Sequence, residues 1–260
     1  MGMEKNYLGI MREFLEEHPG VCGIQNDGMV IRHPVYTADK MSAIPFIKSC
    51  AIDTSVFEYI GFQNTRHNDT RGCQNKTVGF FTYDYKFNIV KNNPWACVHK
   101  LAQYKQVMSP DASVFYDASI EEQWINVYLN RFIGALWQKC GLLVIPTISW
   151  GDAQSFEFCF QGVETGSTVA ISTIGVKKDP ASASRFMAGF IEMCKQIQPV
   201  CVICYGIPFP AMYDHARILF VEHEGVTAQR RARERRLQAT PFLPFEDDFR
   251  LYNSISTEGK

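Results

Sequence analysis

The sequence lacks the motifs that most readily identify an enzyme. It contains no GxxxxGK[ST] phosphate loop, no HExxH zinc motif and no GxSxG nucleophile motif. The Gly-rich turn of a dinucleotide-binding unit is also missing. The six histidines show no metal-ligand spacing. These absences remove the usual motif-based assignments, so any functional residues must be found from the fold.

Long apolar runs, strong net charge and dense cysteine are absent as well. No apolar run reaches the length of a membrane span, and no charged-then-apolar signal segment opens the chain, so we expect no membrane partner. The formal net charge of -1 gives no reason to expect nucleic acid as a partner of the whole surface. The nine cysteines are too dispersed for a disulfide scaffold, so we expect the reducing cytoplasm.

What is present is the composition of a folded domain and a regular series of apolar runs. These runs begin near Val78, Val107, Leu142, Thr168 and Val200, at intervals of 29, 35, 26 and 32 residues. Such an interval is the length of one strand-helix unit, and an intervening helix forces parallel pairing. The sequence therefore predicts an α/β fold. It is either TIM-barrel-like, complete or partial, or an open doubly wound sheet, and the chain length favours the barrel.

Capping residues predict the helices between these strands. Asn93-Pro94 and Asp179-Pro180 each combine an N-cap with proline at the first helical position. Ser119 and Glu122 form a capping box. The helix after Ser119 carries a predicted apolar face made of Ile125, Leu129, Phe132, Ile133 and Leu136.

We divide the chain into three parts. Residues 1–76 hold an N-terminal helix and an irregular part of the same domain, residues 77–225 form the repeated strand-helix core, and residues 226–260 hold an arginine-rich helix and the C-terminal tail. The arginines either contact nucleic-acid phosphates or pair with nearby acids on a solvated helix. They are Arg230, Arg231, Arg233, Arg235 and Arg236.

Candidate functional residues follow the predicted strands, because ligands bind at the C-terminal ends of parallel strands in both architectures. Asp111 and Asp152 are the expected catalytic residues, as a general acid and base. Carboxylates converging there could instead coordinate a divalent cation, or simply cap helices and turns. Asp84 follows the first of these strands. The expected ligand-binding residues are Ser113, Trp150, Ser172, Tyr205 and Glu222.

A series of ordered motifs resembles an uncharacterised family of bacteria, plasmids and phages. The motifs are FFTYDYKF at 80–87, SPDASVFYD at 109–117, Asn130-Arg131, VIPTISW at 144–150, VAIST at 169–173 and Tyr205-Gly206. This series is similar to the family called domain of unknown function 4417. Ala112 departs from the family pattern, in which a larger, often aromatic residue is expected. The resemblance implies a bacterial or mobile-element origin, with host cytoplasm if phage-encoded, and implies no particular activity.

Three functions remain open on these residues. The first is an enzyme that acts on a phosphorylated or nucleotide-like small molecule at the strand ends. The second is a non-catalytic protein of a mobile element that binds a ligand or a host factor. The third is a nucleic-acid-associated replication protein, which the arginine cluster alone supports.

Overall fold

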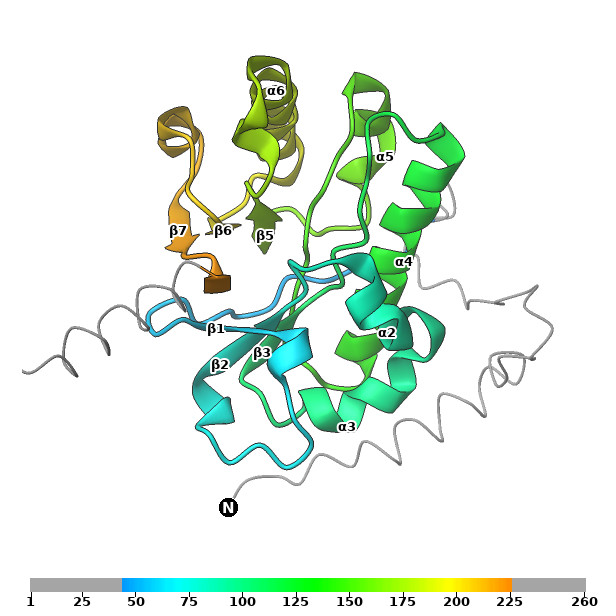
Figure 1. Cartoon of the computed structure of the whole chain (residues 1–260), viewed down its shortest axis with the longest axis vertical. Coiled ribbons are helices and arrows are strands. Elements are labelled where there is room, and N and C mark those ends of the chain that lie inside the picture. Colours follow the sequence, from blue (N-terminus) through cyan, green and yellow to red (C-terminus); the bar gives the residue numbers. More distant parts are fainter. Residues whose placement is uncertain (1–43, 226–260) are drawn as a thin grey trace, which may run out of the picture. The chain divides into compact units, whose positions relative to one another are not determined.

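The structure is a computed structural model of the chain, and it describes residues 44–225 (Figure 1). The chain divides into two compact units, Met1–Glu222 and His223–Lys260, and the fold given below is that of the first unit. The predicted N-terminal helix and the arginine-rich segment lie outside the described residues.

Parallel strands alternate with helices through the described residues. The strands are β1 (Glu58–Gly61), β2 (Lys76–Gly79), β3 (Gln106–Met108), β4 (Val144–Ile145), β5 (Thr168–Ser172), β6 (Cys201–Tyr205) and β7 (Ile218–Val221). The α-helices are α2 (Asn88–Asn92), α3 (Val98–Leu101), α4 (Ile120–Lys139), α5 (Phe156–Cys159) and α6 (Pro180–Ile197). The 3₁₀ helices are η1 (Phe62–Asn64), η2 (Cys73–Asn75), η3 (Asp84–Phe87), η4 (Pro94–Cys97), η5 (Ala153–Ser155), η6 (Val176–Lys178) and η7 (Pro210–Asp214).

The strands pair in parallel and in chain order, which confirms the predicted α/β class. β1–β4 form a four-stranded sheet, and β5–β7 form a three-stranded sheet. A parallel bridge between Thr147 and Ala170 connects the two sheets. Across it, Ile148 N donates to Ala170 O at 2.8 Å, and Ala170 N donates to Pro146 O at 2.9 Å. No ladder joins β7 to β1 within residues 44–225, so a closed barrel is not shown.

The inner faces of the two sheets share one hydrophobic cluster. The ring of Tyr59 on β1 lies 4.7 Å from the ring of Tyr205 on β6, although these strands belong to different sheets. Gly79 makes room for this contact, because a Cβ there would lie 2.2 Å from the Tyr59 ring. The buried members of this cluster are Met108, Ile145, Ala170, Ile203, Tyr205 and Val221.

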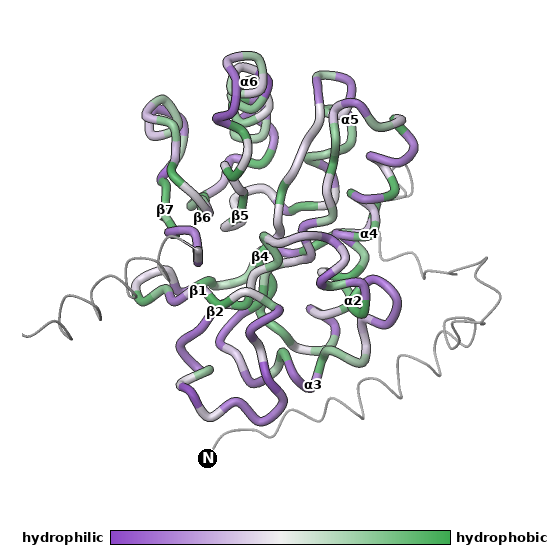
Figure 2. The backbone as a smooth tube through the Cα atoms, viewed as in Figure 1, coloured by the Kyte–Doolittle hydropathy of each residue, from purple (hydrophilic) through white to green (hydrophobic). Residues whose placement is uncertain are grey.

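Helices cover the opposite faces of both sheets. Side chains of α3 and α4 pack with Val78, Val107 and Val144, and side chains of α6 pack with Val169 and Val202. Hydrophobic residues are concentrated along the strands and recur along the helices, whereas the residues that connect η1 to β2 are largely hydrophilic (Figure 2). None of the described helices is both long and apolar enough to span a membrane.

The predicted N-caps are confirmed. The side chains of Asn93, Ser119 and Asp179 each accept a hydrogen bond from the backbone N–H three residues later. The predicted apolar face of α4 is wrong at Ile125, which is 51% exposed. The helix instead turns Asn130 and Arg131 inward, where both are buried.

Other boundaries differ from the sequence prediction for identifiable reasons. The apolar run 142–148 yields only β4 and one bridge residue, because Pro146 has no N–H to donate to a ladder. The helix expected to open at Asn93 and extend to about Tyr104 is divided into η4 and α3. β1 lies in the region expected to be irregular, and it pairs with β2 along its whole length.

Candidate active site at the ends of β2 and β3

Asp84 and Ser113 join the two loops that follow β2 and β3. Because β2 and β3 are parallel neighbours, both loops leave from the same edge of the sheet. The Ser113 hydroxyl donates to Asp84 Oδ1 at 2.9 Å, and Ser113 N donates to Asp84 Oδ2 at 3.3 Å. Lys91 Nζ, on α2, donates to Asp84 Oδ2 at 2.9 Å. One carboxylate therefore fixes a hydroxyl and an ammonium group beside the strand ends.

Asp111 is a second carboxyl group in this cluster, and its environment is different. Burial and the nearby Asp84 carboxylate raise the pKa of Asp111 to about 7, while Lys91 acts in the opposite direction. Among the residues that the structure describes, its carboxyl group has no hydrogen-bond partner and no ion pair within 4.0 Å. It is therefore a carboxyl group that can gain or lose a proton near neutral pH.

Two asparagines of α4 hold the loop that carries Asp111 and Ser113. Asn130 Nδ2 donates to Pro110 O at 2.6 Å, and Asn126 Nδ2 donates to Ser113 O at 2.8 Å. These bonds lie on either side of Asp111 in the sequence. The helix thus positions the acid and the hydroxyl through the backbone on which they stand.

Arg131, the residue after Asn130, is buried and connects several segments near this loop. Its side chain is among the largest fully buried ones, and its guanidinium donates to Thr147 O at 2.9 Å, Cys159 O at 2.7 Å and Gln161 O at 3.0 Å. It also donates to Asn130 Oδ1 at 2.5 Å. Burial lowers the pKa of Arg131 to about 10, so the group stays charged at neutral pH. The arginine therefore ties the end of β4 and the segment after α5 to the helix that holds the site.

Exposed aromatic side chains flank the acidic cluster in both loops. Tyr83 and Tyr85, on either side of Asp84, are 70% and 67% exposed, and their rings stack at 5.8 Å with an interplanar angle of 16°. Tyr116, in the next loop, is 54% exposed, and the Arg185 guanidinium of α6 lies 4.1 Å from its ring centroid. Rings this exposed are available to contact a ligand.

The structure gives Asp152 and Trp150 structural contacts. Asp152 Oδ1 accepts a hydrogen bond from Gln154 N at 3.0 Å and thereby caps η5. The Trp150 ring packs against Phe186 at 5.0 Å and against Gly189, where a Cβ would lie 2.2 Å from the indole. A catalytic role for Asp152 and a ligand-binding role for Trp150 stay predictions, and these contacts account for both residues without a ligand.

The remaining predicted residues are distributed over the β5–β7 sheet. Ser172 Oγ accepts a hydrogen bond from Ile174 N at 3.2 Å at the end of β5. Tyr205 is buried between the sheets, where its ring stacks on Phe81 at 5.1 Å. Glu222 follows β7 directly and is partly buried. The structure holds Asp111 and Ser113 in one loop after β3, whereas these three residues follow or lie on β5, β6 and β7.

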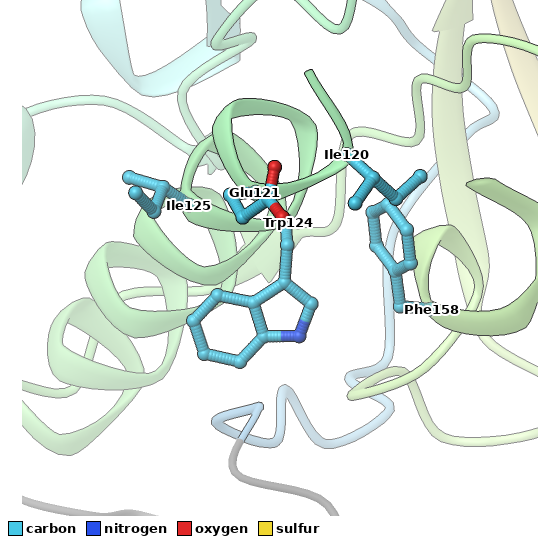
Figure 3. Close-up of a pocket in the computed structure, with 5 residues that line it drawn as sticks. All are labelled: Ile120, Glu121, Trp124, Ile125 and Phe158. Atoms are coloured by element: carbon cyan, nitrogen blue, oxygen red, sulfur yellow. The ribbon is translucent and has the colours of Figure 1, made fainter.

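A separate hollow of about 420 Å³ lies at the start of α4 (Figure 3). Figure 3 shows the Trp124 indole and the Phe158 ring on its walls. The other lining residues are Ile120, Glu121 and Ile125, and none of the predicted site residues is among them. The single pocket predicted for Asp111, Trp150, Asp152, Ser172 and Tyr205 therefore stays a prediction.

The cluster is a poor match to a resident metal site. Within residues 44–225, no group of three or more His, Cys, Asp or Glu side chains is arranged to hold a metal ion. Asp84 and Asp111 would supply two carboxylates, but Lys91 already pairs with the first. The proton chemistry of Asp111 is therefore the better supported use of these acids.

Sequence reasoning missed Lys91 and the role of Asn130. Lys91 lies seven residues after Asp84, on α2, which follows η3 directly, and the two consecutive helices bring the side chains together. Asn130 belongs to a motif of the family resemblance, which carried no role for it. That motif was the one available signal, since a buried polar pair on a helix requires a partner.

Comparisons with known proteins give a family and two phage relatives. The family model described as Domain of unknown function (DUF4417) matches residues 36–224. "Gene 1 protein" of Mycobacterium phage L5 is 34% identical over 141 residues, which cover 54% of this chain and 62% of the relative. "Gene 1 protein" of Mycobacterium phage D29 is 33% identical over 141 residues, covering 54% of this chain and 52% of the relative.

The extent of these matches decides what they show. The chain spans less than two thirds of the length of either phage relative, so the relatives indicate a phage-associated protein and no activity. No solved structure matches the chain. The family model, by contrast, covers most of the chain, including both loops of the candidate site. The chain therefore belongs to the family described as domain of unknown function 4417.

Proposed function

We propose that the protein is an enzyme that acts on a phosphorylated or nucleotide-like small molecule at the ends of β2 and β3. The observation that supports this most is Asp111, a desolvated carboxyl group without a hydrogen-bond partner among the described residues, beside the Asp84–Lys91 ion pair. A carboxyl group placed this way costs stability and is rarely retained for structure alone. Proton transfer is the chemistry that such a group performs best.

Each member of the cluster has a role in this proposal. Asp111 transfers the proton, as base when ionised and as acid when protonated. Ser113 donates its hydroxyl hydrogen to Asp84, so its oxygen lone pairs face other donors on a ligand. Lys91 supplies positive charge that attracts a phosphate oxygen, and Asp84 limits where its ammonium group lies. Asp152 and the ligand-binding residues on β5–β7 belong to the same proposal as more distant contributors.

We also propose that β1–β7 form an open barrel of the TIM type. Strand order follows chain order, helices cover the outer faces, and side chains of β1 and β6 meet inside. In such a barrel the candidate site lies on the face where TIM-barrel enzymes carry their chemistry. The phage relatives support a host-cell setting, and the free cysteines within residues 44–225 support the cytoplasm.

A non-catalytic ligand- or host-factor-binding protein is the second candidate. The apolar hollow on α4 favours it, because Ile125 and Trp124 form a surface suited to contact and not to proton transfer. Nucleic-acid association through Arg230–Arg236 has no support from the described residues, because this segment lies outside them. Turnover separates the enzyme from the binding protein.

The test compares product formation by two charge-matched variants. Purified protein is incubated with nucleoside phosphates and sugar phosphates, with and without chelator, and products are measured by mass spectrometry. We expect Asp111→Asn to lower kcat by about 100-fold or more, because general acid-base catalysis contributes about that much. Asp117→Asn removes the same charge from an exposed residue of the same loop, and it should leave turnover unchanged.

The pH profile provides a second measurement. A rate limb near pH 7 is expected in the wild type and should disappear in Asp111→Asn. Full turnover by Asp111→Asn would refute the catalytic role of this residue. A folded protein that binds these compounds but converts none of them would favour the binding protein instead.

A further inference from the structure

We infer that this site takes a nucleotide unit, whose base stacks on the Tyr83–Tyr85 pair and whose phosphate meets Lys86 beside it. The inference rests on the proposed function for the location of the site and deepens it by naming the substrate class. It is carried by the position, exposure and charged neighbours of the aromatic side chains.

The tyrosine pair lies in the loop that carries Asp84 of the candidate site. Tyr83 and Tyr85 immediately precede and follow Asp84, which is hydrogen-bonded to Ser113 of the neighbouring loop. The two rings stack on each other at 5.8 Å and remain about two thirds exposed. Their stacking holds the rings parallel, and their exposure leaves ring surface open to a flat ligand. Protein aromatic side chains bind bases of any sequence in this way.

Positive charge accompanies the rings. Lys86 Nζ lies 5.4 Å from the Tyr83 ring centroid, and no carboxylate of residues 44–225 lies within 4.0 Å of it. A second ring–cation pair lies in the next loop, where Arg185 lies over Tyr116 and its Nη2 donates to Ser182 Oγ at 3.0 Å. A flat ring and a nearby cation together match a base that carries a phosphate. A neutral sugar would use the rings and leave the cations unused.

The α4 hollow lacks this combination. Its lining residues are apolar apart from Glu121, whose negative charge repels phosphate. A nucleotide is therefore better accommodated at the tyrosine pair than in the hollow. The same chemistry could come from a free nucleotide or from single-stranded nucleic acid, and the experiment must distinguish these two sources.

Binding is measured by calorimetry with AMP, UMP, ribose 5-phosphate and a single-stranded oligothymidylate. Stacking of one base contributes enough to give AMP and UMP about tenfold tighter binding than ribose 5-phosphate. The double variant Tyr83→Ala/Tyr85→Ala should remove that tenfold difference and leave ribose 5-phosphate binding unchanged. Tyr213→Ala is the matched control, because Tyr213 is 56% exposed on η7 in another loop.

The outcomes are distinct. Tighter binding of AMP than of oligothymidylate assigns the site to free nucleotides, and the reverse assigns it to single strands; either supports the inference. Equal binding of AMP and ribose 5-phosphate, absence of binding by both AMP and oligothymidylate, or an unchanged double variant overturns it. Asp111→Asn separates this result from the proposed function, because it should lower kcat by about 100-fold or more while base-dependent binding persists.

Discussion

Two aspartates near opposite ends of β3 lie in opposite environments. Asp69 lies in the connection from η1 to η2 and contacts Tyr104, two residues before β3. It accepts hydrogen bonds from the Arg71 guanidinium at 2.6 and 2.8 Å and from the Tyr104 hydroxyl at 2.7 Å. The Arg71 side chain holds the pKa of Asp69 well below its usual range. After the strand ends, Asp111 has no such partners among the described residues, and burial raises its pKa to about 7.

This difference separates an aspartate that stabilises the fold from one that is available to a ligand. The carboxylate of Asp69 is fully satisfied, and burial together with its hydrogen bond raises the pKa of Tyr104 to about 12. Such a group stabilises the chain and has no remaining capacity for chemistry. Asp111 is costly to the fold and is available to a ligand. In folds of parallel strands, the strand starts commonly serve stability and the strand ends carry function.

Replacement of Arg131 should have the largest effect on stability. It tests whether the end of β3 that carries the candidate site also depends on a residue that stabilises the fold. Arg131→Met removes donors from three backbone carbonyl groups that are bonded at 2.7 to 3.0 Å. Each buried carbonyl group left without a donor costs about 1–3 kcal/mol of unfolding free energy. We expect a large fall in melting temperature, measured by thermal unfolding monitored with circular dichroism.

Arg131→Lys serves as the control for this prediction. The single ammonium of lysine cannot reach the carbonyl groups of Thr147, Cys159 and Gln161 together, so it should recover little of the loss. A lysine variant as stable as the wild type would show that charge alone is required. The network of directed hydrogen bonds would then not be what holds this layer.

Asp69→Asn should have the next largest effect and tests the structural end of the comparison. The amide accepts one bond from Arg71 less favourably and loses the ion pair, so the melting temperature at pH 7 should fall by several degrees. The pKa of Asp69 is lowered on folding, so its contribution is present above about pH 4 and is lost as pH falls further. The difference from wild type should therefore shrink in acid, and a constant difference would contradict this account.

The sequence predicts the order and direction of the strands because each unit is a local pattern. The N-caps at Asn93, Ser119 and Asp179 and the parallel pairing from β2 to β6 depend on neighbours close in the chain. The sequence favours one or two further strands between Cys22 and Phe62, but it does not define β1, because its four residues carry no local signal stronger than the turns around them. Its place is fixed by pairing with β2, which is a tertiary property.

In the candidate site, too, the sequence predicts residues with a local signal and misses those that depend on tertiary contacts. The rule that ligands bind at strand ends finds Asp111 and Ser113, because both follow β3 directly. It also selects Asp152, which the structure places at the cap of η5. An acidic residue after a strand can cap a helix or bind a ligand. Its hydrogen-bond partners in the structure distinguish the two roles. Lys91 could not be found in this way, because it lies on α2 and not directly after a strand.

Asp111→Asn tests the functional end of the comparison, with the smallest and oppositely signed effect on stability. Folding raises the pKa of Asp111 from 3.8 to about 7, so the folded state binds a proton that the unfolded state has released. The contribution of this group to stability is therefore fully present below about pH 4 and is lost as pH rises towards 7. The neutral amide avoids this loss. We expect the variant to melt a few degrees above wild type at pH 8 and at nearly the same temperature at pH 4.

The sign of this effect separates function from structure. A structural aspartate loses stability on replacement by asparagine, as expected for Asp69, whereas a residue retained for chemistry at the expense of the fold gains it. The measurement is a pair of melting curves at pH 4 and pH 8 for wild type, Asp111→Asn and Asp117→Asn. Asp117 is exposed in the same loop, so its variant should show no such pH-dependent gain. A loss of stability in Asp111→Asn at pH 8 would place Asp111 with Asp69 and remove the contrast between the two ends of β3.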